Sequence, residues 1–202
     1  YQLIQRAKIV KMAENKIAFI PDILNKYYSK NQSWLIYCQQ ESQLSAVKKL
    51  VDECKIDHIF QYTSKKEESY NRDLELNHFK NVGGVLLAVN CLDEGVDIPQ
   101  ITHAIILASS KNPRQFVQRR GRVLRKFGVK EMAHIFDFFI KPKDNYEDFD
   151  MIMKNEMERA KVMADAATNS TSIIQIIRER LDQPIDNSVE FEIDIYNENI
   201  ED

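Results

Sequence analysis

The sequence has few of the residues that mark disulfide-bonded, metal-binding or membrane-spanning proteins. Its three cysteines, Cys38, Cys54 and Cys91, are too far apart to form a CxxC pair. An odd, scattered set of cysteines is typical of free thiols in a reducing compartment, so we expect a cytoplasmic protein. The four histidines are also dispersed, which argues against a zinc site. No apolar run approaches the roughly 20 residues that span a membrane, and the first residues show no signal-peptide pattern, so we expect no membrane association.

Glycine is also scarce, with five residues in 202. The sequence contains no GxxxxGK[ST] phosphate-binding loop and no GxGxxG motif, and the second absence argues against a dinucleotide-binding enzyme. Its composition is otherwise that of a globular protein, 44% hydrophobic and 29% charged, and its length suits one domain with an appendage. The first residue is Tyr1 rather than methionine, so we expect a piece of a longer protein.

The net charge of −3 conceals two segments of opposite charge. Residues 188–202 contain six acidic residues and no basic residue, so removing the −6 of this tail changes the net charge from −3 to +3. Between Lys111 and Lys130, by contrast, there are eight basic residues and no acidic residue. A basic cluster of this density favours a polyanionic ligand, although a solvated basic surface has the same composition.

Apolar runs alternate with amphipathic segments through most of the sequence. Five runs have the length of buried strands, at residues 34–38, 59–62, 84–89, 104–108 and 134–140. Helical periodicity is found at residues 2–28, 41–53, 67–80 and 113–120, and Pro21 is expected to break the first of these helices. Strands and helices in this alternation predict an α/β fold with a parallel sheet flanked by helices. Ligands of such folds bind beyond the carboxyl ends of the strands.

The C-terminal part has a helical pattern over residues 145–181, with a break expected near residues 169–172. Residues 189–196 alternate apolar and acidic side chains, which fits either an edge strand or a solvated tail. We therefore expect a helical lead-in over residues 1–30, an α/β domain over residues 31–142, and a helical extension with an acidic tail over residues 143–202. Several side chains are expected to be structural, as core, strand or helix-packing residues: Trp34, His134, Asp137, Met151, Met153, Met157 and Met163.

One segment with chemical character is LLAVNCLDEGVDIP, residues 86–99. A buried strand runs into a loop in which Gly95 permits close approach of the backbone to a ligand and Asp97 can orient a polar group. The adjacent Asp93 and Glu94 are also compatible with a magnesium site. That interpretation is disfavoured because the sequence has no phosphate-binding loop to act with them.

The second such segment is QFVQRRGRVLR, residues 115–125. Arg122 and Arg125 are three residues apart and project from one face of a helix. Two guanidinium groups on one face, with Gly121 allowing close approach, suit a triphosphate whose charge spreads in the transition state. This pattern predicts arginine fingers.

The two segments resemble motifs V and VI of superfamily 2 helicases, in the same order and at a similar separation, and residues 34–38 resemble motif IV. The resemblance covers residues 32–140. It implies a RecA-like C-terminal helicase lobe that takes part in ATP hydrolysis, with ATP and Mg²⁺ held mainly by an N-terminal lobe of the same chain. A lobe of this kind is expected to be inactive alone.

The resemblance also assigns roles to individual residues. Arg122 and Arg125 match the arginine fingers. The matches to nucleotide-contacting positions are Gly95, Asp97, Gln118 and Arg119. The end of the strand that precedes motif V matches the family's contact with the phosphate backbone, at Ala88, Val89 and Asn90. Many relatives have threonine where this sequence has Val89, so the backbone amides or Asn90 would make that contact.

A weaker match concerns Thr63, Ser64 and Arg72. They lie near the position where relatives often carry a histidine-glycine pair before a helix with an arginine, but Arg72 comes about three residues late. These residues therefore fit either a nucleic-acid contact or a plain turn.

The substrate implied by the resemblance is nucleic acid. Motif VI here begins with Gln118 and has Val-Leu before its last arginine, as in double-stranded DNA translocases of restriction and repair, rather than the histidine of RNA-remodelling enzymes. DNA is thus favoured over RNA, and nucleoid association fits as well as a free cytoplasmic state. The alternative is a degenerate lobe that acts as a non-catalytic nucleic-acid-binding or scaffold module, against which both arginines of motif VI argue.

Overall fold

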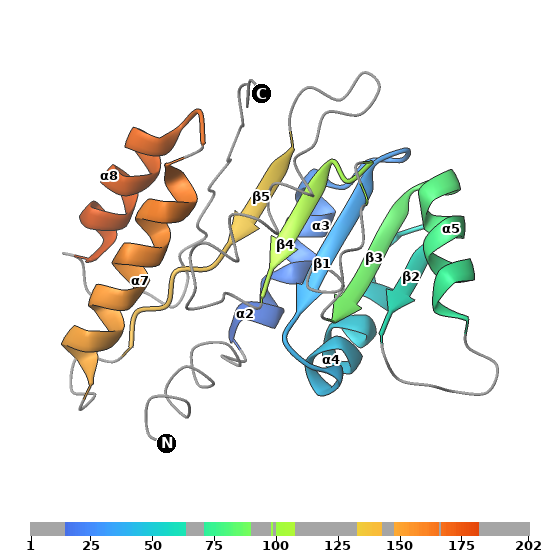
Figure 1. Ribbon diagram of the computed structural model, residues 1–202, viewed down its shortest axis with the longest axis horizontal. Helices are drawn as coiled ribbons and strands as arrows, with labels where there is room; N and C mark the ends of the chain where they lie inside the picture. Colours follow the sequence, from blue (N-terminus) through green and yellow to red (C-terminus); the bar gives the residue numbers. More distant parts are fainter. Residues whose placement is uncertain are drawn as a thin grey trace.

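The computed structural model of the protein describes residues 15–63, 71–89, 98, 100–107, 133–142, 148–165 and 167–181. Within these ranges five parallel strands form one sheet in the order β2-β3-β1-β4-β5 (Figure 1). Their bounds are β1 (Ser33–Cys38), β2 (Ile59–Tyr62), β3 (Gly84–Val89), β4 (His103–Ile106) and β5 (His134–Asp137). The predicted α/β fold with a parallel sheet is confirmed.

Two helical layers bury the sheet. One face is covered by α3 (Ile20–Tyr27) and α4 (Glu41–Asp52), which pack on alternate strand residues such as Ile36 and Leu87. On the other face, α5 (Arg72–Val82) lies beside β2, while α7 (Phe149–Ala164) and α8 (Ser170–Leu181) lie side by side near β5 (Figure 1). Since both faces are covered, β1 and β3 are buried at every position, which explains their continuous apolar sequences.

A glycine pair sets the entry into β3. Gly83 and Gly84 have φ angles of 75° and 102°, which L side chains rarely adopt. A Cβ atom added to Gly84 would lie 2.4 Å from the carbonyl oxygen of His58. Only glycine therefore allows the backbone of β3 to approach the start of β2 this closely.

An aromatic row crosses the sheet at the start of β1, β4 and β5. Trp34, His103 and His134 are aligned in register, and their rings stack at centroid distances of 4.3 and 4.6 Å. Trp34 is 0% exposed, as expected for a core residue. Burial, together with the charge of His134, lowers the pKa of His103 to about 4, so this imidazole is neutral at neutral pH.

The first helical segment is divided as predicted. α2 (Asn15–Ala18) ends just before Phe19, and Pro21 stands in the first turn of α3, where its missing N–H has no intrahelical partner to lose. Residues 2–14 of the predicted helix lie outside the described residues, as do the predicted helix at residues 113–120 and the predicted strand or tail at residues 189–196.

Two predicted helix boundaries are wrong. The helix expected from residue 67 begins only at Arg72, because the Asn71 side chain caps it by accepting hydrogen bonds from the N–H groups of Asp73 and Leu74. The break expected near residues 169–172 comes earlier, since α7 ends at Ala164 and Ser170 already starts α8.

The strand expected over residues 134–140 is also too long, because β5 ends at Asp137. Its neighbour β4 pairs only as far as Ile106, opposite Asp137. Beyond that point the carbonyl of Phe138 accepts from Arg159, and the N–H of Ile140 donates to Glu156. Side chains of α7 therefore take the backbone groups that a longer strand would use.

Of the methionines expected to pack within a helix interface, Met163 is buried and Met157 packs against the same core cluster. Among the described residues, none of the helices is both long enough and apolar enough to cross a membrane.

Candidate functional site

The carboxyl edge of the sheet brings together the ends of β1, β2 and β3. Ala88 pairs in register with Tyr37 of β1 and with Tyr62 of β2, and Val89 pairs with Cys38. The segment that contains Gly95 and Asp97 leaves the sheet here, directly after β3. The structure thus places Ala88, Val89 and Thr63 at one edge, where parallel α/β folds bind ligands.

The side chains of Ala88 and Val89 are buried, at 0% and 4% exposure. Ala88 faces the core under α5, and Val89 packs on the opposite face with α4. A ligand at this edge can therefore meet only the main chain of these two residues. The expectation that backbone amides or Asn90 replace the hydroxyl that relatives carry at the position of Val89 stays a prediction.

Thr63 is committed to a contact within the protein. It is 8% exposed, and its hydroxyl donates a hydrogen bond to the carboxylate of Glu41, the first residue of α4. This bond joins the end of β2 to the helix that follows β1. Thr63 thus has a structural role at the edge, in line with the turn that sequence reasoning left open.

Among the described residues, Arg72 brings a partly exposed cation to this edge. It is the first residue of α5, its guanidinium carbon lies 4.9 Å from the ring centroid of Tyr62, and its side chain is 39% exposed. Stacking on Tyr62 holds the guanidinium beside the end of β2 by a cation–π contact. The guanidinium also lies 4.0 Å from the carboxylate of Asp73, and its exposed part can bind a phosphate.

The remaining predicted site residues lie outside the described residues: Ser64, Asn90, Gly95, Asp97, Gln118, Arg119, Arg122 and Arg125. The described residues that flank the segments 90–97 and 108–132 are buried. Ile98 and Ile101 are 2% and 0% exposed in the core cluster under α5 and α7, while Leu107 and Ala133 are 0% and 1% exposed. Both segments with chemical character are therefore anchored in the core at their ends.

Sequence reasoning missed Lys16, which is 1% exposed. Its ammonium donates a hydrogen bond of 3.3 Å to the carbonyl of Leu107, the last described residue before the arginine-rich segment. A signal was available, because Lys16 is four residues before Ile20 and so shares the buried face of the predicted helix. The pattern does not predict which carbonyl accepts the hydrogen bond from this lysine.

A buried ionic cluster joins β5 to α7. Arg159 pairs with Asp137 and with Glu156, and also donates to the Phe138 carbonyl at 2.7 Å. Burial by itself lowers the pKa of Arg159, but the two carboxylates outweigh it and raise the pKa above its ordinary value. The guanidinium therefore stays charged, and Asp137 is structural, as expected.

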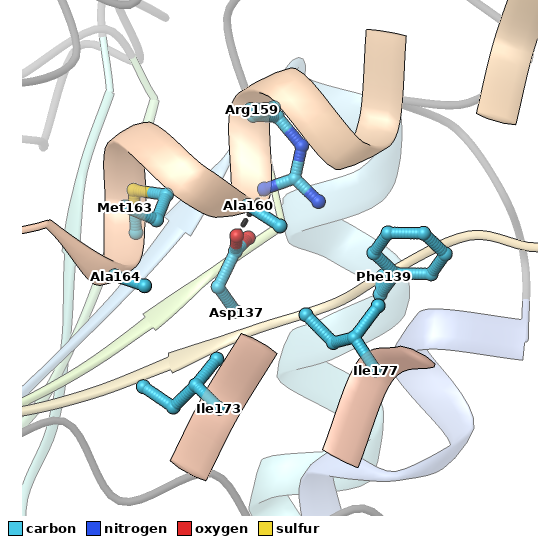
Figure 2. Close-up of a pocket in the computed structure, with 8 residues that line it drawn as sticks. All are labelled: Asp137, Phe139, Arg159, Ala160, Met163, Ala164, Ile173 and Ile177. Atoms are coloured by element: carbon cyan, nitrogen blue, oxygen red, sulfur yellow. Dashed lines mark hydrogen bonds and ion pairs between the residues drawn. The ribbon is translucent and has the colours of Figure 1, made fainter. Parts of the chain in front are cut away.

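Figure 2 shows the cavity beside this cluster, lined mainly by apolar side chains of α7 and α8. Its volume is about 20 Å³, little more than the room that one water needs, so it cannot hold a nucleotide. Among the described residues no group of three or more histidines, cysteines or carboxylates is placed to bind a metal. The carboxyl edge remains the candidate site.

Comparison with known protein families gives the family of the chain. The family described as the helicase conserved C-terminal domain matches residues 15–127, more than half of the chain. The chain belongs to this family. The match includes both segments that resemble motifs V and VI, and the resemblance to a superfamily 2 helicase C-terminal lobe is confirmed.

Relatives of this helicase lobe act on different nucleic acids. It is 30% identical over 115 residues to the DNA 3'-5' translocase XPB2 of Sulfurisphaera tokodaii, covering 56% of this chain and 24% of that protein. It is also 30% identical over 128 residues to a putative ATP-dependent RNA helicase of Methanocaldococcus jannaschii, covering 61% of this chain and 15% of that protein. The chain thus spans a quarter or less of the length of these two curated relatives.

The fold of the lobe is that of a solved helicase. The crystal structure of UvsW from phage T4 matches 82% of this chain and 35% of the UvsW chain, with a TM-score of 0.58 and 21% identity. This likeness confirms the predicted RecA-like fold, a parallel sheet flanked by helices.

Proposed function

We propose that this chain is the second motor lobe of an ATP-dependent helicase or translocase that acts on nucleic acid, with DNA preferred. ATP and Mg²⁺ are held mainly by an N-terminal lobe of the same protein, and the nucleotide lies between the two lobes. Arg122 and Arg125 reach across to the phosphates as arginine fingers. Gly95, Asp97, Gln118 and Arg119 contact the nucleotide from this side.

The observation that carries the proposal is the match of residues 15–127 to the helicase C-terminal family, since this range contains both arginines and both chemical segments. The carboxyl edge supports it as well. There β3 ends with Ala88 and Val89, whose main chain faces the edge. The exposed guanidinium of Arg72 makes a cation–π contact with the ring of Tyr62 at the same edge. The nucleic-acid track that we propose runs along this edge, past the main chain of Ala88 and Val89 and through Ser64, Arg72 and Asn90.

The catalytic contribution of the chain is electrostatic. Charge spreads over the oxygens of the transferred phosphoryl group in the transition state, and a guanidinium placed there stabilises it by two hydrogen bonds in a fixed fork. Because the arginines and the ATP-binding groups are on different lobes, hydrolysis requires the lobes to close. Closure and reopening would then move the lobes along the nucleic acid.

The test compares this chain alone with the full-length protein that contains it, in an ATP hydrolysis assay with duplex DNA, single-stranded DNA or RNA. We expect hydrolysis only by the full-length protein, and greater stimulation by duplex DNA than by RNA. Equal or greater stimulation by RNA would contradict the DNA preference. A full-length protein that binds nucleic acid but hydrolyses no ATP would establish the degenerate lobe instead.

A further inference from the structure

We propose that Lys16 is a positioning residue, which fixes the point where the arginine-bearing segment leaves the sheet. This inference rests on the proposed function, because it concerns the rate of ATP hydrolysis. Lys16 stands outside motifs V and VI, in the short helix α2 that precedes the sheet.

The geometry concerns both polar backbone groups of Leu107. Its N–H donates to the carbonyl of Tyr37 at 3.0 Å, which continues the pairing of β4 with β1 by one residue. Its carbonyl lies beyond the ladder with β5, which ends at the pair Ile106 and Asp137, and accepts from the ammonium of Lys16 at 3.3 Å. The backbone of Leu107, itself 0% exposed, is thus held from β1 and from α2.

The chemistry indicates that Lys16 does more than fill space. Lys16 is 1% exposed, and burying an ammonium costs several kcal/mol unless its hydrogen bonds compensate. A methionine has nearly the same length and would cover the same apolar surface without that cost. What lysine adds at this position is a strong, charged donor to a carbonyl.

The bond between Lys16 and Leu107 matters because Leu107 directly precedes the segment that carries the arginines. Residues 108–132, which include Arg122 and Arg125, start from this carbonyl. Lys16 and Leu107 are 91 residues apart in sequence, so the bond joins the chain before the sheet to the exit from β4. Under the proposed function the first lobe precedes α2 in the sequence. The bond then joins the segment that links the two lobes to the segment that carries Arg122 and Arg125.

The experiment uses the full-length protein with Lys16→Met and, as a matched control, Lys26→Met. Lys26 lies in α3 of the same helical layer but is exposed, so its ammonium does not fix β4. We measure kcat and KM for ATP in the presence of DNA, and the melting temperature of each variant. For Lys16→Met we expect kcat to fall roughly 10- to 100-fold with KM for ATP within about twofold, because a misplacement of about 1 Å costs this much in rate.

We expect the melting temperature of Lys16→Met to match that of the wild type. A lower kcat at an unchanged melting temperature would show that the lost hydrogen-bond donor affects the rate of hydrolysis rather than the stability of the fold. Wild-type kcat in Lys16→Met would overturn the proposal. So would a variant that fails to fold, or one whose loss of rate follows its loss of folded protein, because either result assigns Lys16 to stability alone. If Arg122→Ala also hydrolyses ATP at the wild-type rate, the proposed function itself fails; if only Lys16→Met does, this inference alone fails.

Discussion

Replacing Arg159 by leucine is expected to destabilise the chain strongly. Asp137 and Glu156 are 10% and 7% exposed, and both pair with the Arg159 guanidinium. In Arg159→Leu two carboxylates would stay buried without that cation. The variant would also lose the donor to the Phe138 carbonyl, which ties α7 to the end of β5.

The expected magnitude follows from the geometry. Breaking a buried ion pair by removing one partner costs about 3–5 kcal/mol, since the remaining charge is desolvated and uncompensated. For a chain of this size, 1 kcal/mol corresponds to about 2–4 °C in melting temperature, so we expect a decrease of roughly 6–20 °C. The triple variant Asp137→Asn, Glu156→Gln, Arg159→Leu should recover part of this loss, because no charge is then left buried.

Trp34 provides the assay, because it is the only tryptophan and is fully buried at the centre of the sheet. Its fluorescence reports urea unfolding at pH 7. Arg178→Leu, at an exposed position of α8, serves as control and should change stability by less than about 0.5 kcal/mol. A loss below about 1 kcal/mol in Arg159→Leu would refute the reasoning.

Two further predictions concern the two edges of the sheet. Because the pKa of His103 is lowered to about 4, the unfolded chain takes up a proton below about pH 6.5 that the folded chain refuses. Stability should therefore fall between pH 7 and pH 5 by about 1 kcal/mol, allowing for partial exposure of the imidazole, and urea unfolding of His103→Phe should lack this component. At the carboxyl edge, Arg72→Ala in the full-length protein should weaken DNA binding to a similar extent for all sequences and reduce the salt slope by about one. Lys80→Ala, in the last turn of the same helix, should leave both unchanged, and equal effects of the two substitutions in a fluorescence anisotropy titration would count against a phosphate contact at Arg72.

The strands were predictable because the sheet is covered on both faces, so that β1 and β3 are buried along their whole length and consist mostly of apolar residues. Their order in the sheet was not, because it depends on which strands the crossovers bring together. The end of β5 was missed for a related reason. Arg159 and Glu156, on a helix that follows later in the sequence, take the backbone groups of Phe138 and Ile140.

For the site, the general rule about carboxyl edges pointed to the end of β3, and the structure has Thr63 and Arg72 beside that end, next to Tyr62 of β2. The contacts that decide their roles are tertiary and left no pattern in the sequence. The hydroxyl of Thr63 meets Glu41, which is 22 residues away, and the ammonium of Lys16 meets a carbonyl 91 residues away. Such pairings depend on the packing of α2 and α4 against the sheet.

The central claim, that Arg122 stabilises the transition state of ATP hydrolysis from this lobe, is tested most directly by one comparison. In the full-length protein with Arg122→Ala, the rate of DNA-stimulated hydrolysis at saturating ATP is measured beside the affinity for a fluorescent ATP analogue. We predict a rate lower by about 10³-fold or more, with an affinity within about tenfold of the wild type. Hydrolysis near the wild-type rate, in a variant that binds the analogue normally, would contradict this account.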